Sequence, residues 1–230
     1  MADMWVGVNG ADEALRQVNA EMLGGARALA DQAAAQVVAI VWGASAAGHA
    51  KALASWGADR VVIVESEAAP APEAVARTLA RLAAEGAPAV VLLADGAESR
   101  VAAPLLAEAL DAPLFSDVVD IEAGDEVFFT RLPYTAKVIE RVTAAAPTVV
   151  ATVRPKALPV PEADASRTAE VVAAPADAAD LARIVQSVAR AASERVDLAE
   201  ADIVVAGGRG CKGPEGFAVI ESLADALGAA

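Results

Sequence analysis

Residues 37–42 read Val-Val-Ala-Ile-Val-Trp, an unbroken apolar run of strand length. A strand with one solvated face alternates apolar and polar residues, whereas a strand covered on both faces is apolar throughout. This segment therefore predicts a strand in the interior of a sheet with helices packed on both sides.

Similar apolar runs of strand length occur in the flanking sequence. They alternate with segments in which apolar residues recur at helical spacing. Strands are predicted at 5–8, 37–42, 61–64 and 89–94, and helices at 15–30, 46–56, 72–84 and 97–110. This order indicates an α/β fold: a Rossmann-like, mostly parallel sheet with flanking helices and right-handed crossovers. Pro104 must lie in the first turns of the last helix or kink it.

The pattern changes after Pro113. Four strand candidates follow with no helix between them, at 114–121, 126–132, 137–142 and 148–153. Such runs predict antiparallel strands added at the edge of the sheet. One more strand is expected at 167–172, and 177–193 fits either a helix or a strand.

A new strand-turn-helix unit begins after residues 195–201, with a strand at 203–205, a glycine turn at 207–210 and a helix at 214–227. A single unit of about 30 residues cannot bury both faces. We therefore expect an N-terminal α/β domain at 1–195 and, at 196–230, a partial second α/β unit, the truncated start of another domain.

The charge balance excludes several classes of function. The formal net charge is −14, and a phosphate backbone or anionic lipid surface requires the opposite sign. No apolar stretch reaches about 18 residues, so we expect no membrane insertion and a cytoplasmic protein. With Cys211 and His49 as the only residues of their types, neither a disulfide nor a metal site is expected.

The most informative motif is Ala206-Gly207-Gly208-Arg209-Gly210, between the strand at 203–205 and the helix at 214–227. Glycines allow a sharp turn and close approach of backbone N–H groups to a ligand, and a helix N-terminus attracts phosphate. Arg209 adds a guanidinium that can bind phosphate through two hydrogen bonds. The alternative is a tight turn with Arg209 in solvent.

A second polar group follows the strand at 89–94, with Asp95-Gly96 and Glu98-Ser99-Arg100 at the end of the sheet where α/β proteins bind ligands. A helix cap is the preferred interpretation there. No nucleophile–His–carboxylate set can be assembled around a single histidine.

The segment Asp197-Leu-Ala-Glu-Ala-Asp-Ile-Val-Val-Ala-Gly-Gly-Arg-Gly210 resembles the opening of the flavin domain of electron transfer flavoprotein alpha subunits, as do Lys212 and residues 214–217 and 223–229. The resemblance extends to the first domain through Leu23-Gly24-Gly25-Ala26-Arg27, Ser55-Trp56-Gly57-Ala58-Asp59-Arg60 and Val150-Ala151-Thr152-Val153-Arg154-Pro155. It implies a domain 1–195 of the alpha-subunit type and the start of the FAD-binding domain at 196–230.

What the resemblance implies about function is specific. Arg209, with Gly208 and Gly210 beside it, would bind FAD in the complete protein, although these 230 residues would not retain FAD tightly. The protein would form a heterodimer with a beta subunit and carry electrons from dehydrogenases to a quinone-linked oxidoreductase. It would be an electron carrier subunit and not itself an enzyme. One departure concerns Pro133 to Lys137, where the family has a Gly-Gly-Asn or Ala-Gly-Asn stretch; contacts made by this hairpin are therefore in doubt.

Two other functions stay open on the residues alone. An adenine-nucleotide-binding α/β domain without an electron-transfer role would need a glycine-rich phosphate loop after one of the first four strands. A dinucleotide-dependent oxidoreductase would need G-x-G-x-x-G after the first strand, and Gly7-Val8-Asn9-Gly10-Ala11-Asp12 does not fit that pattern.

Overall fold

The computed structural model describes residues 2–8, 15, 17–43, 45–65, 70–124, 126–175, 198 and 201–230. The chain divides into two compact units, Met1–Gln186 and Ser187–Ala230, and each is described by itself. The boundary expected at residue 195, and the segment 177–193 of uncertain secondary structure, lie outside the described residues.

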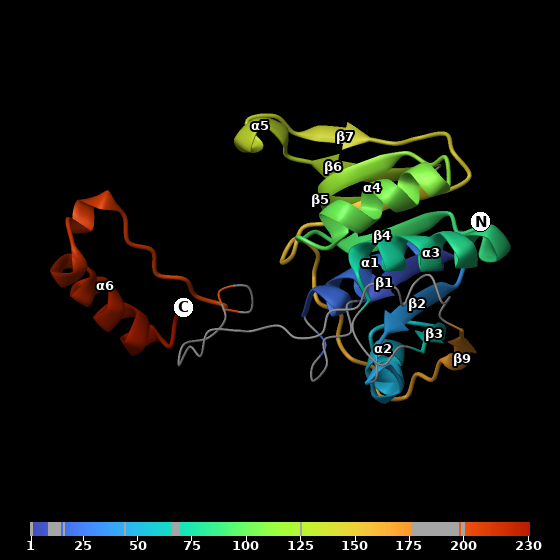
Figure 1. Ribbon diagram of the computed structural model, residues 1–230, viewed down its shortest axis with the longest axis horizontal. Helices are drawn as coiled ribbons and strands as arrows, with labels where there is room; N and C mark the ends of the chain where they lie inside the picture. The colour runs from blue at the N-terminus through green and yellow to red at the C-terminus, as the bar shows by residue number, and fades with distance from the viewer. Residues whose placement is uncertain are drawn as a thin grey trace. The chain divides into compact units, whose positions relative to one another are not determined.

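The first unit is built on a nine-stranded sheet with the order β7-β6-β5-β8-β4-β1-β2-β3-β9 (Figure 1). Seven neighbouring strands, from β5 to β9 in this order, run parallel, whereas β6 and β7 form antiparallel pairs at one edge. The strands are β1 Met4–Val8, β2 Val37–Trp42, β3 Arg60–Val64, β4 Val90–Ala94, β5 Leu114–Ala123, β6 Val127–Arg131, β7 Glu140–Val142, β8 Val149–Val153 and β9 Glu170–Ala174.

Helices cover both faces of the sheet (Figure 1). One core lies between the sheet and the helices α1 and α2, and a second core lies between the sheet and α3 and α4. The helices of this unit are α1 Gln17–Ala33, η1 Ala46–His49, α2 Ala50–Ser55, α3 Pro72–Gly86, α4 Ser99–Ala109 and the short turn α5 Pro133–Ala136. The predicted α/β class, with its mostly parallel sheet and added antiparallel strands, is confirmed.

The two cores follow from the period of two along each strand. In β1, Met4, Val6 and Val8 pack toward α1, whereas Trp5 packs on the opposite side with α3 and α4. All six residues of β2 are buried, as its apolar run predicts.

The strand β8 differs from the expectation of an antiparallel addition at the edge. It lies inside the sheet, parallel to both β4 and β5. The physical reason is in its composition, because Val-Val-Ala-Thr-Val is buried throughout and needs cover on both faces. The chain therefore returns from β7 across the sheet before β8 begins.

The opposite edge of the sheet is formed by β9, which pairs with β3. The sequence predicted this strand at 167–172, three residues early. The predicted strand at 137–142 is shortened to β7, because α5 and the residues after it form the turn of the β6–β7 hairpin.

The paired glycines of α1 allow another segment to lie directly on the helix. A Cβ added to Gly24 would lie 2.9 Å from Cδ of Pro161, and one added to Gly25 would lie 2.8 Å from Cδ1 of Leu158. The buried Glu21 carboxylate accepts the Lys156 N–H at 2.7 Å. The segment after β8 is therefore held across α1 by close packing and a buried hydrogen bond.

The Gly57-Ala58-Asp59 turn is likewise explained by its contacts. Asp59 accepts hydrogen bonds from Arg27, from the Val37 N–H at 2.9 Å and from Arg167 at 2.8 Å. Gly57 has φ +118°, a backbone conformation that other residues rarely adopt. Asp59 thus links α1, β2 and the segment before β9 through hydrogen bonds.

The second unit consists of an extended segment, a glycine turn and a helix. The extended segment, predicted as a strand at 203–205, is not part of a described sheet. Its backbone nevertheless pairs with Ala230: the Ala230 N–H donates to Ile203 at 3.1 Å, and the Val205 N–H donates to Ala230 at 3.0 Å. This pattern is that of two parallel strands. The helices are η2 Arg209–Cys211 and α6 Pro214–Leu227.

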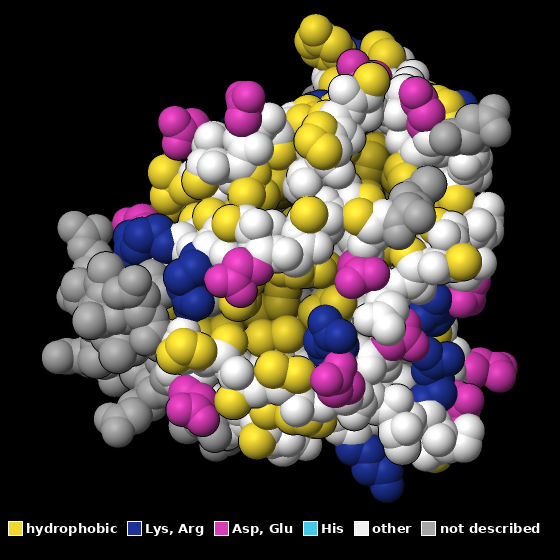
Figure 2. Space-filling model, turned by 90° about the vertical axis from the view of Figure 1, so that its right-hand side faces the viewer, with side chains coloured by type: hydrophobic (Ala, Val, Ile, Leu, Met, Phe, Trp, Pro, Cys, Tyr) yellow, Lys and Arg dark blue, Asp and Glu magenta, His cyan; other side chains and the backbone are white. Residues whose placement is uncertain are grey.

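Within the described part of the chain, no helix is long and apolar enough to cross a membrane. Figure 2 shows acidic and basic side chains interspersed on the face that it displays, with hydrophobic side chains in a hollow between them. That face has no continuous basic surface of the kind that nucleic acid binding requires.

Candidate functional site: the glycine turn before α6

The turn at 207–213 leads directly into the N-terminus of α6. The Cys211 N–H donates to Gly208 at 3.0 Å, and the Lys212 N–H donates to Arg209 at 3.2 Å, closing η2. Pro214 occupies the first turn of α6, where its fixed φ suits a helix and its missing N–H costs nothing.

Two glycines are required by packing inside the unit. A Cβ on Gly207 would lie 2.8 Å from the Phe217 ring, and a Cβ on Gly216 would overlap the Cys211 carbonyl. These two positions bring the turn close against the first turns of α6. Their role is structural, and the sequence did not single out Gly216.

The two glycines predicted as site residues have different surroundings. A Cβ on Gly208 or Gly210 would meet nothing within 4 Å, so both have open space beside them. Among the described residues, no acceptor pairs with the backbone N–H groups of Gly208, Arg209 or Gly210. These N–H groups are thus free to bind a ligand.

Arg209 and Lys212 supply the positive charge of the turn. Both are exposed, and neither forms an ion pair within the described part of this unit. A guanidinium without a carboxylate partner is free for an anion, and the N-terminus of α6 adds a favourable dipole. The turn therefore presents hydrogen-bond donors, positive charge and an open glycine surface, which suit an anionic ligand.

The adenine-nucleotide alternative requires a phosphate-binding site in the first unit. A small pocket lies where β1 and β4 end and α3 and α4 begin, the position at which α/β sheets bind ligands. Among the described residues, its lining is apolar apart from Glu98 and Ser99 and includes no Lys or Arg. A carboxylate without a basic partner opposes phosphate binding, so this pocket does not favour the alternative.

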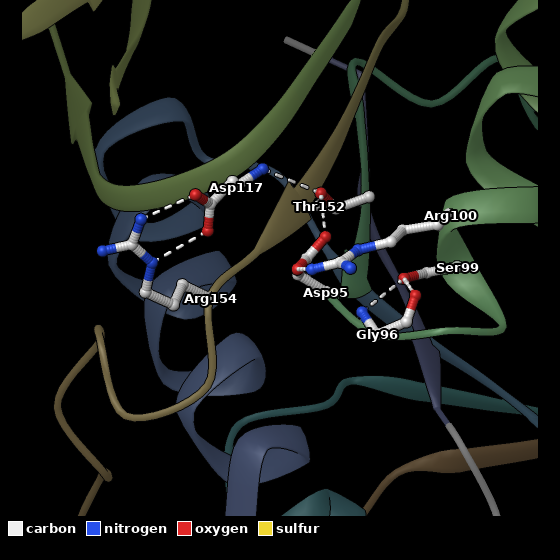
Figure 3. A network of polar contacts seen from close by, with 7 residues as sticks. All are labelled: Asp95, Gly96, Ser99, Arg100, Asp117, Thr152 and Arg154. Atoms are coloured by element: carbon white, nitrogen blue, oxygen red, sulfur yellow. Dashed lines mark hydrogen bonds and ion pairs between the residues drawn. The ribbon is translucent and has the colours of Figure 1, made fainter. Parts of the chain in front are cut away.

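A polar network joins the ends of β4 and β8 to Asp117 within β5 (Figure 3). Arg154 donates from Nε at 2.8 Å and from Nη2 at 2.6 Å to the two carboxylate oxygens of Asp117. The Thr152 hydroxyl accepts the Asp117 N–H at 2.9 Å and donates to Asp95 at 3.2 Å. Arg100 completes the network with an ion pair to Asp95 at 3.0 Å.

The network explains the polar group predicted after the strand at 89–94. Asp95 is held by β8 and Arg100, and the Ser99 hydroxyl accepts the Gly96 N–H at 2.9 Å. These contacts are structural, but the preferred interpretation as a helix cap is not confirmed, because the N-cap residue Glu98 forms no side-chain cap hydrogen bond. The partners Asp117 and Thr152 were missed. Their only signal was a carboxylate and a hydroxyl within predicted strands.

The electrostatics of the network follow from the ion pairs. Hydrogen bonds from Arg154 hold the pKa of the Asp117 carboxyl below its usual range, with Arg100 and Arg131 contributing more weakly. The Asp117 carboxylate raises the pKa of Arg154 in turn, chiefly through the same hydrogen bonds. Both groups stay charged over the physiological pH range.

No cluster of His, Cys, Asp and Glu suited to a metal ion occurs among the residues that the structure describes. Cys211 is a free, partly buried thiol in the turn.

Comparison with known proteins assigns the two parts of the chain to two different domain families. Residues 4–179 match the family model of the electron transfer flavoprotein domain, and residues 197–230 match that of the electron transfer flavoprotein FAD-binding domain. Together they define a flavoprotein of the electron-transfer class.

Individual relatives identify the family more narrowly than the domain models do. The alpha subunit of the electron transfer flavoprotein of Syntrophomonas wolfei is 37% identical over all of this chain and 72% of its own length. Those of Bacillus subtilis and Mycobacterium tuberculosis are 32% and 39% identical, over 68% and 71% of their own lengths and 95% and 100% of this chain. The chain belongs to the electron transfer flavoprotein alpha subunit family.

Proposed function

We propose that, in the complete protein, this chain helps to carry electrons through FAD held at the turn 207–213, between dehydrogenases and a quinone-linked acceptor. The bound flavin would supply the redox chemistry, and the protein would hold and position it. On this proposal the chain is an electron carrier subunit and has no catalytic residues of its own. It works in the cytoplasm as a heterodimer with a beta subunit.

The observation that supports the proposal most directly is the open surface at Gly208 and Gly210, with the exposed Arg209 guanidinium between them, which pairs with no carboxylate among the described residues. Arg209 donates to the anionic side of FAD, and the free N–H groups of the turn add neutral donors. Gly207 and Gly216 keep these donors in place by allowing the turn to pack on α6.

The test is FAD titration into the apo-heterodimer of the complete protein carrying Arg209→Ala. A hydrogen bond to a charged group contributes about 1.5–3 kcal/mol. The variant should therefore bind FAD about ten- to a hundredfold more weakly, since each 1.4 kcal/mol is about tenfold. Arg209→Lys should recover only part of the loss, because an ammonium lacks the two-pronged geometry.

Lys212→Ala is the matched control, since it removes a positive charge from the same turn. It should change FAD affinity much less than Arg209→Ala. Equal FAD affinity of Arg209→Ala and wild type would show that Arg209 is a solvent-facing residue and that the site is wrongly placed.

Retention of the cofactor gives a simpler measurement. The 230 residues present few flavin contacts, and a partial site must still order its groups on binding. We expect the purified 230-residue chain to be colourless, with no flavin absorbance band. A yellow protein with stoichiometric FAD would contradict this expectation.

A further inference from the structure

The peptide bond between Asp95 and Gly96 joins two residues whose chemistry allows the main chain to rearrange. This is the only Asp-Gly pair in the sequence, and it follows directly after β4. Because glycine has no side chain, its nitrogen can closely approach the carboxyl carbon of a preceding aspartate. Attack by that nitrogen on the carboxyl carbon closes a succinimide ring, which reopens in part as isoaspartate.

The rearrangement balances with water as the only other reactant. The Gly96 nitrogen bonds to Cγ of Asp95, and the proton of the nitrogen leaves with the carboxyl hydroxyl as water. Water then adds to the succinimide. Opening at the former main-chain carbonyl leaves the chain running through Cγ, with the same mass as before. The product has an extra methylene in the main chain between β4 and α4.

The folded chain holds the attacking nitrogen in a hydrogen bond. The Gly96 N–H donates to the Ser99 hydroxyl at 2.9 Å, and that hydroxyl donates to the Gly96 carbonyl at 3.1 Å (Figure 3). Ser99 is 8% exposed, so little water competes for these bonds. The nitrogen must release the Ser99 hydroxyl before it can lose its proton and turn toward Asp95.

The carboxylate that would be attacked is held at both oxygens. The Thr152 hydroxyl donates to Oδ1 of Asp95 at 3.2 Å, and Nη2 of Arg100 donates to Oδ2 at 3.0 Å. The Asp95 N–H also donates to the Val153 carbonyl at 2.7 Å, which fixes the main chain on the other side of the carboxylate. The side chain of Asp95 is only 10% exposed. The carboxyl group must therefore release two partners before Cγ can meet the Gly96 nitrogen.

We propose that Asp95-Gly96 is a latent isoaspartate site, and that Ser99, Arg100 and Thr152 protect it from rearrangement in the folded chain. The reaction proceeds through local openings that break these hydrogen bonds, so its rate follows the population of the opened state. This role is independent of cofactor binding. It gives the polar network of Figure 3 a chemical function in addition to its structural one.

The test incubates the folded 230-residue chain at neutral pH and measures isoaspartate at residue 95 by peptide mass spectrometry with chromatographic separation of the isomers. Ser99→Ala should raise the rate about two- to tenfold, because the net free energy of one hydrogen bond changes the opened population by that factor. Arg100→Ala should raise it about two- to fivefold, since Arg100 is 73% exposed and an exposed ion pair contributes less. The chain denatured in guanidinium should rearrange fastest.

Arg141→Ala is the matched control, because it removes an ion pair of 2.8 Å, to Glu122, outside this network. Its rate should equal that of wild type, and circular dichroism would check that every variant is folded. Gly96→Ala tests the site itself: the added Cβ meets nothing within 4 Å, yet it obstructs the attack of the nitrogen. Combined with Ser99→Ala, it should abolish the increase.

Three results would overturn the inference. In the first, Ser99→Ala and Arg100→Ala rearrange no faster than wild type or Arg141→Ala. In the second, the folded wild-type chain rearranges as fast as the denatured chain, so that the network gives no protection. In the third, the denatured chain forms no isoaspartate at residue 95.

Discussion

Asn in place of Asp117 should destabilise the first unit by breaking the two-pronged ion pair between Asp117 and Arg154. Two charge-assisted bonds, of 2.6 and 2.8 Å, join Asp117 to Arg154 and connect β5 to the end of β8. Asp117 also has φ +60°, and Asn tolerates this conformation as well as Asp does. Asp117→Asn therefore removes the charge without adding backbone strain.

The magnitude follows from the exposure of the pair. Hydrogen bonds to charged groups contribute about 1.5–3 kcal/mol when buried, and exposed ion pairs contribute about 0.2–1 kcal/mol. The Arg154 and Asp117 side chains are 40% and 46% exposed, so the lower range applies. We expect a loss of about 1 kcal/mol, or about 2–4 °C in Tm for a unit of this size.

The pH dependence has a definite sign. The Arg154 hydrogen bonds lower the pKa of Asp117 in the folded state. The stability that Asp117 contributes is thus fully present above its unfolded pKa, about 3.9, and is lost as pH falls through the lower folded value. The gap between wild type and Asp117→Asn should be constant at neutral pH and should close in acid.

Urea unfolding followed by circular dichroism would measure both effects. A double-mutant cycle with Arg154→Gln isolates the pair, and its coupling free energy should be about 1 kcal/mol. A coupling below about 0.3 kcal/mol, the usual error of additivity, would refute the reasoning. So would a stability gap that persists unchanged below the pKa of Asp117.

Three further predictions concern a residue with a left-handed backbone conformation, a closely packed glycine and the helix of the second unit. Thr135→Gly should raise the free energy of unfolding by about 0.5–1 kcal/mol, because glycine adopts φ 58° without steric cost; Thr130→Gly in β6 should lower it. Gly24→Ala should cost about 1–3 kcal/mol, since the Pro161 ring is 2.9 Å from the added Cβ, whereas Gly48→Ala, with no neighbour within 4 Å, should not; thermal unfolding compares them. In hydrogen exchange, α6 should be less protected than β2, because Leu223 and Leu227 are about half exposed whereas Ile40 is fully buried; equal protection would contradict this.

Much of the parallel sheet could be predicted because its strands are apolar throughout. Val37 to Trp42 has no polar residue to place in solvent, so only a strand covered on both faces satisfies it. The family resemblance was equally local, since the segment 197–210 is contiguous in sequence, and it was confirmed by the match to the FAD-binding domain.

Contacts between distant residues decided the rest. The position of β8 between β4 and β5 depends on which partners can cover it, and no local pattern encodes that choice. Asp117 looked like an ordinary residue of an edge strand until folding brought Arg154 and Thr152 to it, 37 and 35 residues away.

In the turn before α6, local sequence determines some features and tertiary packing determines others. Its sequence determined that Arg209 lies among glycines at a helix N-terminus, because turn chemistry acts over a few residues. Only the tertiary structure separated Gly207 and Gly216, which are packed against Phe217 and Cys211, from Gly208 and Gly210, which have open space. The distinction depends on how closely α6 approaches the turn, and that distance is set by the packing of the whole unit.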